Sequence, residues 1–148
     1  MACRITMSLL SESQTGTIGN DWKYSLEVRI FRTGVSRALT GEGTISVPEH
    51  RLESGKKQVP PGPPEALVLP AGEAGAEILV DLRIKVAEVD LVQDDVAETT
   101  GSFKMHCPAA GGPAVVEERE ISVSNLERPS GIGRAVFTLG YQVTLESA

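Results

Sequence analysis

The sequence is poor in several residue types on which whole classes of protein depend. Its 148 residues include two histidines and two cysteines, and aromatic residues make up 4%. So few histidines leave little for acid–base catalysis, and no GxSxG motif with a paired base is present. Cys3 and Cys107 lie far apart, and we expect buried free thiols, not a disulfide or a redox pair. The composition favours a protein that is not an enzyme.

Long apolar runs and an excess of basic residues are also missing. No segment approaches the roughly 18 apolar residues of a membrane span, and the N-terminus has too short an apolar stretch for a signal peptide. The formal net charge is −6 and the basic residues are scattered, so nucleic acid is not an expected partner. We therefore expect a cytoplasmic protein that does not bind nucleic acid.

What the sequence does contain is alternation of apolar and polar residues with a period of two, the pattern of a half-buried strand. It is strongest over residues 22–30, 78–87 and 135–145. Weaker runs cover residues 3–9, 45–47, 66–69, 103–105 and 115–123. Residues 115–121 also fit a short helix, but their ValVal start and the alternation that follows favour a strand. The pattern predicts one all-β domain over residues 1–148, an antiparallel β-sandwich of about eight strands.

The order of the strands predicts where the long connections lie. If eight strands alternate in direction, the connections after the odd-numbered strands all emerge at one end of the sandwich. Those are the long ones, residues 11–21, 48–65, 88–100 and 125–133. Because binding surfaces are often built from loops held on a rigid scaffold, this loop end is the candidate working surface.

One of these loops is rich in carboxylates. Residues 88–95 read EVDLVQDD, with four acidic side chains in Glu88, Asp90, Asp94 and Asp95. Carboxylates held close together repel one another unless a cation compensates, and Ca²⁺ prefers oxygen ligands in flexible loops. The loop is therefore a candidate Ca²⁺ site. The alternative is an exposed acidic turn that needs no ion.

The acidic spacing resembles that of a C2 domain, an eight-stranded sandwich whose third calcium-binding loop carries Asp-x-Asp, further aspartates and then a glycine. Glu88-Val89-Asp90, Asp94-Asp95 and Gly101 stand in those places, with Glu88 where the family usually has aspartate. Asp21, just before the strand at Trp22, corresponds to an aspartate of the first C2 loop. The resemblance implies that the metal ligands are Asp21, Glu88, Asp90, Asp94 and Asp95.

The other residues suited to chemistry form weaker patterns. His106 and Cys107 are adjacent, so on a strand they point to opposite faces, and they lack zinc-site spacing with His50 and Cys3. The turn at residues 131–133 (GIG) precedes a strand, so it reads as a hairpin, not a phosphate loop. Trp22 and Tyr24 fall on the apolar face of their strand, which predicts core packing over sugar stacking.

These patterns favour a non-catalytic interaction module with a candidate Ca²⁺ site at the loop end. A protein partner, self-association included, ranks above membrane lipid, because no polybasic cluster of four or more residues is present. The alternative function is a structural or assembly protein that builds a larger complex through its sheet edges or faces without metal.

Overall fold

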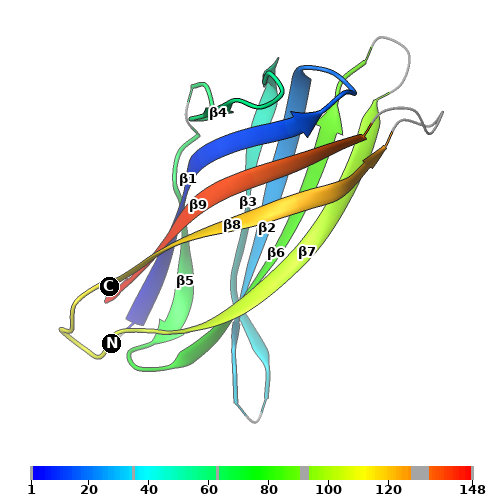
Figure 1. Cartoon of the computed structure of the whole chain (residues 1–148). Coiled ribbons are helices and arrows are strands. Elements are labelled where there is room, and N and C mark those ends of the chain that lie inside the picture. Colours follow the sequence, from blue (N-terminus) through cyan, green and yellow to red (C-terminus); the bar gives the residue numbers. More distant parts are fainter. Residues whose placement is uncertain (1, 35, 63, 91–93, 128–133, 148) are drawn as a thin grey trace.

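Two antiparallel β-sheets pack face to face in the structure, a computed structural model that describes all residues except 1, 35, 63, 91–93, 128–133 and 148 (Figure 1). The described strands are β1 (Ala2–Gly16), β2 (Asp21–Arg32), β3 (Ala38–Arg51), β4 (Lys57–Gln58), β5 (Leu67–Glu73), β6 (Glu77–Glu88), β7 (Asp95–His106), β8 (Val115–Glu127) and β9 (Arg134–Ser147). One sheet has the order β4-β1-β9-β8, with β5 also paired to β1, and the other has the order β3-β2-β6-β7. The predicted all-β sandwich is confirmed.

The predicted strands are present, and several are longer than the alternation indicated. The three strongest segments became β2, β6 and β9, and residues 115–123 belong to strand β8, not to a helix. The short β4 lies inside the connection predicted for residues 48–65 and makes the described total nine. Both β4 and β5 run antiparallel to β1, so they point in the same direction. The additional strand β4 therefore does not change the direction of the strands that follow it. The predicted alternation of direction is therefore preserved.

The core lies between the sheets and is built from the predicted apolar faces. Trp22 and Tyr24 are 0% and 4% exposed, which confirms their predicted core packing. Both rings pack on Phe137 of the opposite sheet, with ring centroids 5.8 and 4.9 Å apart. These three of the six aromatic residues thus fix one sheet against the other near the loop end.

A β-bulge in β1 changes which side chains face the core. The pairing of β1 with β9 shifts between Leu9 and Ser11, so Leu10 is an extra residue. Before the bulge the odd-numbered Ile5 and Met7 are buried, and after it the even-numbered Glu12 and Gln14 are. The bulge therefore points two polar side chains inward at the loop end.

Strand β5 closes one side of the sandwich. It pairs with β1 of one sheet and packs against β3 of the other, where a glycine makes room for it. A Cβ on Gly41 would lie 2.6 Å from the carbonyl oxygen of Pro70. On the opposite side, Arg119 of β8 lies 3.9 Å above the ring of Phe103 of β7. β5 thus bridges the two sheets on one side, whereas on the other β7 and β8 remain separate sheet edges with a cation–π contact between them.

Cys3 and Cys107 form a disulfide, so the prediction of free thiols is wrong. Their Cα atoms lie 6.1 Å apart although the residues are 104 positions apart in sequence, and both are buried. Cys3 belongs to β1 of one sheet, and Cys107 directly follows β7 of the other. Sequence distance misled the prediction because antiparallel packing brings these strand ends together at the end opposite the loop end.

We expect the disulfide to contribute about 2–5 kcal/mol to the free energy of unfolding, because it closes a loop of more than a hundred residues. Thermal melting with and without a reductant checks this. Reductant should lower the melting temperature of the native chain and leave that of the double variant C3A/C107A unchanged. Equal melting of the native chain in both conditions would contradict the disulfide.

We expect Gly41→Ala to lower the free energy of unfolding by about 1–3 kcal/mol, because its Cβ would press on the backbone of β5. Gly101→Ala is the matched control, since a Cβ there meets its nearest atom, Ile121 Cδ1, at 3.6 Å. Chemical denaturation of the two variants compares them. Equal stability in both would show that β5 does not depend on the close approach.

Candidate functional site at the loop end

Backbone hydrogen bonds tie the connections at the loop end to one another. Leu52 N donates to Asn20 O at 2.7 Å, and Val89 N donates to Asp21 O at 2.7 Å. The buried Gln14 side chain adds a third tie, since its Nε2 donates to Gly19 O and Leu52 O. The connections after β1, β3 and β6 therefore lie together, as predicted (Figure 1). Most of the predicted fourth connection, including the turn at residues 131–133, lies outside the described residues.

Three carboxylates gather where β6 ends and β7 begins. Glu88 and Asp95 are opposite each other in the β6–β7 register and are 4% and 3% exposed. Asp90 follows β6 and is exposed. One oxygen from each of the three carboxylates lies within 4.8 Å of the other two. The strand pairing itself thus places two buried acidic side chains side by side at the mouth of the core.

The neighbouring turn is shaped around Glu88. Gly19 has φ of +144°, a conformation that side chains rarely adopt, and a Cβ there would overlap the Glu88 carboxylate. Trp22 Nε1 donates to the carbonyl oxygen of Gly19 at 3.1 Å and holds the turn in place. A surface hollow of about 610 Å³ lies beside it and is lined by Asp21, Glu88 and Asp90 among others. Glu88 therefore reaches a space open to solvent ions even though most of its surface is buried.

The other two predicted ligands lie outside the three-carboxylate cluster. Asp21 lines the same hollow as Glu88 and Asp90, but its carboxylate is not part of the cluster. Asp94 instead accepts a hydrogen bond from Asp90 N at 3.1 Å through Oδ1. Its Oδ2 lies 3.7 Å from Lys23 Nζ. Asp94 thus contacts Asp90 and Lys23 and takes no part in the cluster.

The cluster has the chemistry of a site for a hard cation. Ionised carboxylates held this close in a partly buried position repel one another, and a divalent cation removes that repulsion. Glu88, Asp90 and Asp95 bring three carboxylates together and so are able to hold a metal ion. Such oxygen ligands are compatible with Ca²⁺, the ion that the sequence pattern suggested, but do not by themselves single it out.

A second polar cluster at the loop end was missed from the sequence. Glu12 is fully buried, and its Oε1 accepts a hydrogen bond from the Tyr24 hydroxyl at 2.8 Å. Its Oε2 accepts from Gln58 Nε2 at 2.9 Å and lies 2.5 Å from His50 Nε2. Four strands, β1, β2, β3 and β4, meet in this cluster. No signal in the sequence marks it, because plain alternation from Ile5 and Met7 places Glu12 on the outer face.

The Glu12 cluster joins four strands through the side chains of Tyr24, His50 and Gln58. His50 Nδ1 lies 2.8 Å from Pro48 O while its Nε2 faces Glu12, so both ring nitrogens are engaged. The contacts to both Glu12 oxygens and to both ring nitrogens of His50 suit the burial of these polar side chains. The His106 side chain, by contrast, is 69% exposed.

Comparison with known proteins adds no relationship. No protein-family model matches the chain, and a search of the curated proteins found no match. The C2 resemblance therefore stays a prediction that rests on the acidic spacing and the sandwich. In the described part of the chain no helix could cross a membrane.

The two tyrosines give a test of the buried environment. Burial, reinforced by the hydrogen bond to Glu12 and by its charge, raises the pKa of Tyr24 far above its ordinary range. Burial also raises the pKa of Tyr141 to about 12. The folded chain therefore keeps both phenol protons at pH 10, where the unfolded chain has lost about half of them. Stability should be highest below pH 10 and fall as the pH rises from 10 towards 12.

Absorbance of tyrosinate during an alkaline titration checks this expectation. We expect almost no tyrosinate in the folded protein at pH 10, and half of the total after addition of a denaturant. In the variant Tyr141→Phe, only Tyr24 remains, and its ionisation should coincide with unfolding. Half-ionisation of folded protein at pH 10 would show that the tyrosines are not buried as described.

Proposed function

We propose that the chain is a non-catalytic interaction module with a Ca²⁺ site formed by Glu88, Asp90 and Asp95. The observation that carries the proposal is the convergence of these carboxylates within 4.8 Å, two of them buried, beside a turn whose glycine accommodates Glu88. A cation would neutralise the cluster and tie the end of β6 to the start of β7. The module would thereby gain a loop end of fixed shape.

The C2-like character of the module is part of this proposal. The sandwich architecture, the loops gathered at one end and the acidic residues that follow β6 all agree with it. Asp21 lines the same hollow as Glu88 and Asp90, as a contributor from the first C2 loop should. We place Asp21 next to the ion, not among its first ligands, because its carboxylate lies outside the cluster.

The disulfide changes the compartment that we propose. Disulfides persist in oxidising compartments and are rare in the cytoplasm, where thiols are kept reduced. Cys3 and Cys107 are both buried in their disulfide, which agrees with a structural cross-link and not a redox pair. We therefore favour an oxidising compartment over the cytoplasmic location expected from the sequence, and extracellular Ca²⁺ concentrations would suit a weak site there.

Thermal melting with Ca²⁺ tests the metal site. We expect Ca²⁺ to raise the melting temperature, with a stabilisation of about 2.7 kcal/mol at one hundred times the dissociation constant. Asp90→Asn and Asp95→Asn should each remove most of this shift, because each takes one charge out of the cluster. Isothermal calorimetry on the same proteins measures the affinity directly.

The control is Glu118→Gln, which removes one acidic charge from an exposed position of β8 far from the cluster. It should keep the full Ca²⁺ shift, which separates a specific site from general screening of the net charge of −6. No stabilisation of the native chain by millimolar Ca²⁺, or equal shifts in all three variants, would rule out the site.

Self-assembly is the second candidate function, and the sheet edges favour it. The strands β7 and β8 are both edge strands of more than ten residues, and such edges can pair with another chain. Charged residues on β8, among them Glu118 and Glu120, instead protect an edge from pairing. Light scattering over a range of concentrations distinguishes the two functions, since an interaction module should stay monomeric and an assembly protein should not.

A further inference from the structure

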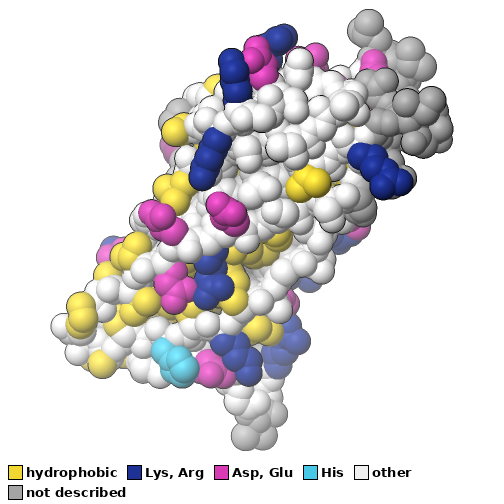
Figure 2. All heavy atoms as spheres, viewed as in Figure 1, with side chains coloured by type: hydrophobic (Ala, Val, Ile, Leu, Met, Phe, Trp, Pro, Cys, Tyr) yellow, Lys and Arg dark blue, Asp and Glu magenta, His cyan; other side chains and the backbone are white. Residues whose placement is uncertain are grey.

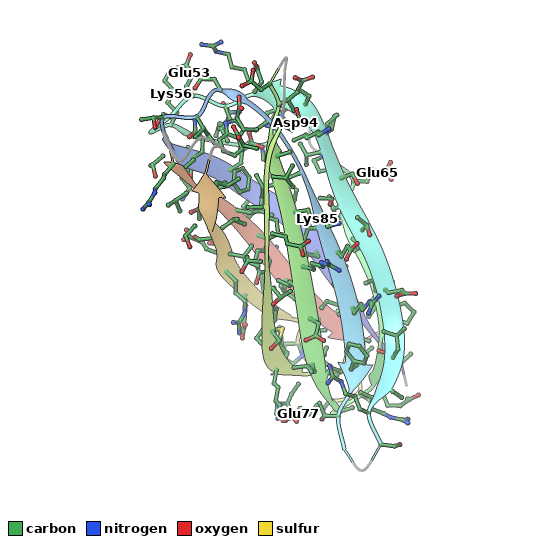
Figure 3. The ribbon with its side chains drawn as sticks, turned by 90° about the vertical axis from the view of Figure 1, so that its right-hand side faces the viewer. Glu53, Lys56, Glu65, Glu77, Lys85 and Asp94 are labelled. Carbon is green, nitrogen blue, oxygen red and sulfur yellow. A yellow bond between two sulfur atoms is a disulfide. The ribbon has the colours of Figure 1, made fainter. Side chains whose placement is uncertain are left out.

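We propose that the outer face of the β3-β2-β6-β7 sheet, next to the loop end, docks an extended peptide that presents an apolar side chain and a carboxylate two residues apart. The inference rests on the proposed interaction module and names its partner surface, but it does not depend on the Ca²⁺ site. Figure 3 views this face, with Lys85 on β6 and Asp94 at the end near the loops.

The surface contains a hollow of about 450 Å³ that spans all four strands. Two rows of side chains cross it in register, one with Lys23, Ala87 and Val96 and one with Ser25 and Lys85. The small Ser25 and Ala87 occupy the two central strands, β2 and β6. The larger Val96 and Pro48 rise from the edge strands β7 and β3. The floor of this hollow, the docking trough, is low at Ser25 and Ala87, and Lys23 and Lys85 of the same two central strands stand beside them.

The walls of this docking trough are apolar and open to solvent. Val96 is 66% exposed, the highest value among the large hydrophobic residues described as exposed. Pro48 is exposed on the facing edge, and Ala87 between them is only 7% exposed. An apolar side chain laid over Ala87 would contact Val96, its cross-strand neighbour, and remove that surface from water, at about 25 cal/mol for each Å² buried.

Two lysines give the trough a preference for a carboxylate. The side chains of Lys23 and Lys85 are 51% and 53% exposed. Their ammonium groups lie 3.7 Å from Asp94 and 4.0 Å from Glu98, near the limit of ion pairing. Glu98 is already held by Arg83 at 2.9 Å, so Lys85 is its weaker partner. Exposed pairs of this kind contribute little, and a ligand carboxylate can therefore replace them.

The spacing of these groups fits an extended chain. Lys85 and Ala87 point to the same face of β6, two residues apart, which places them roughly 7 Å apart along the strand. In an extended peptide the side chains of residues i and i+2 share one face with the same spacing. A peptide aligned with β6 can thus place a carboxylate at Lys85 and an apolar group over Ala87.

A second copy of this chain fits the trough less well than such a peptide. Each copy carries a formal net charge of −6, so two copies repel one another over distances that a short peptide avoids. The trough is also local, covering one end of one sheet face, whereas stable dimers bury about 800 Å² on each partner. We therefore assign the trough to a short segment of a different protein.

The test uses NMR of the isotopically labelled full chain with two blocked peptides, Ser-Leu-Ser-Glu-Ser and Ser-Leu-Ser-Lys-Ser. We expect the glutamate peptide to shift the Val96 methyl signals and the amide signals of Lys23 and Lys85, and the lysine peptide to shift them far less. Lys85→Glu should weaken binding of the glutamate peptide about tenfold, because it reverses the charge that meets the carboxylate.

Lys104→Glu is the matched control. It makes the same charge change on β7, on the same outer face of the sheet but at the end far from the trough. It should leave peptide binding unchanged. Equal binding of both peptides, no shift at Val96, or equal weakening by Lys85→Glu and Lys104→Glu would overturn the proposal. Binding of anionic vesicles through Lys23 and Lys85 without peptide binding, or dimerisation through the trough, would also overturn it.

Each titration is run with Ca²⁺ and with a chelator. Peptide binding that is retained in the chelator, together with a failed Ca²⁺ melting test, would leave the trough in place and remove only the metal site. Ca²⁺ stabilisation without peptide binding would keep the metal site and remove the trough. Asp94 connects the two sites, since it contacts both Asp90 and Lys23, so Ca²⁺ is expected to change peptide affinity only modestly.

Discussion

The extra residue in β1 is the constraint on which the loop end depends. By shifting the β1–β9 register between Leu9 and Ser11, it turns Glu12 and Gln14 inward. Gln14 then holds the connection after β1 against Leu52, and Glu12 joins β1 to β2, β3 and β4 through Tyr24, His50 and Gln58. A buried carboxylate is costly unless its hydrogen bonds are satisfied, so these contacts must form together.

This junction stands next to the acidic cluster and holds its scaffold. Trp22 of β2 pairs with His50 on one side and with Glu88 on the other. Its indole also fixes the carbonyl of Gly19, the residue whose missing side chain admits the Glu88 carboxylate. One side of the loop end is thus a hydrogen-bonded network around Glu12, while on the other side Glu88 and Asp95 are buried and Asp90 is exposed. That contrast supports a structural role for Glu12 and agrees with the cation site proposed at Glu88, Asp90 and Asp95.

The charges over the rest of the molecule are mixed. On the face formed by β1, β9 and β8, acidic and basic side chains are interspersed (Figure 2). Most ion pairs on the described surface, such as Arg29 with Glu42 and Arg37 with Asp81, join neighbouring exposed side chains and contribute little to stability. The features that favour recognition are therefore local, namely the acidic cluster and the trough beside it. The acidic cluster and the trough meet at Asp94, which accepts a hydrogen bond from Asp90 N and lies beside the ammonium group of Lys23.

Local alternation predicts the fold class and the core strands, and the direction rule of antiparallel strands predicts the end at which the connections after β1, β3 and β6 meet, both without knowledge of contacts. The predicted length is wrong for two of these connections, because β1 runs to Gly16 and β7 begins at Asp95. The sequence also marks the acidic segment, because four carboxylates are close in sequence. Only the tertiary structure decided which of them converge, since the pairing of Glu88 with Asp95 depends on strand register. The disulfide between Cys3 and Cys107 and the Glu12 cluster were likewise decided by packing and by one bulge, which join residues that the sequence keeps far apart.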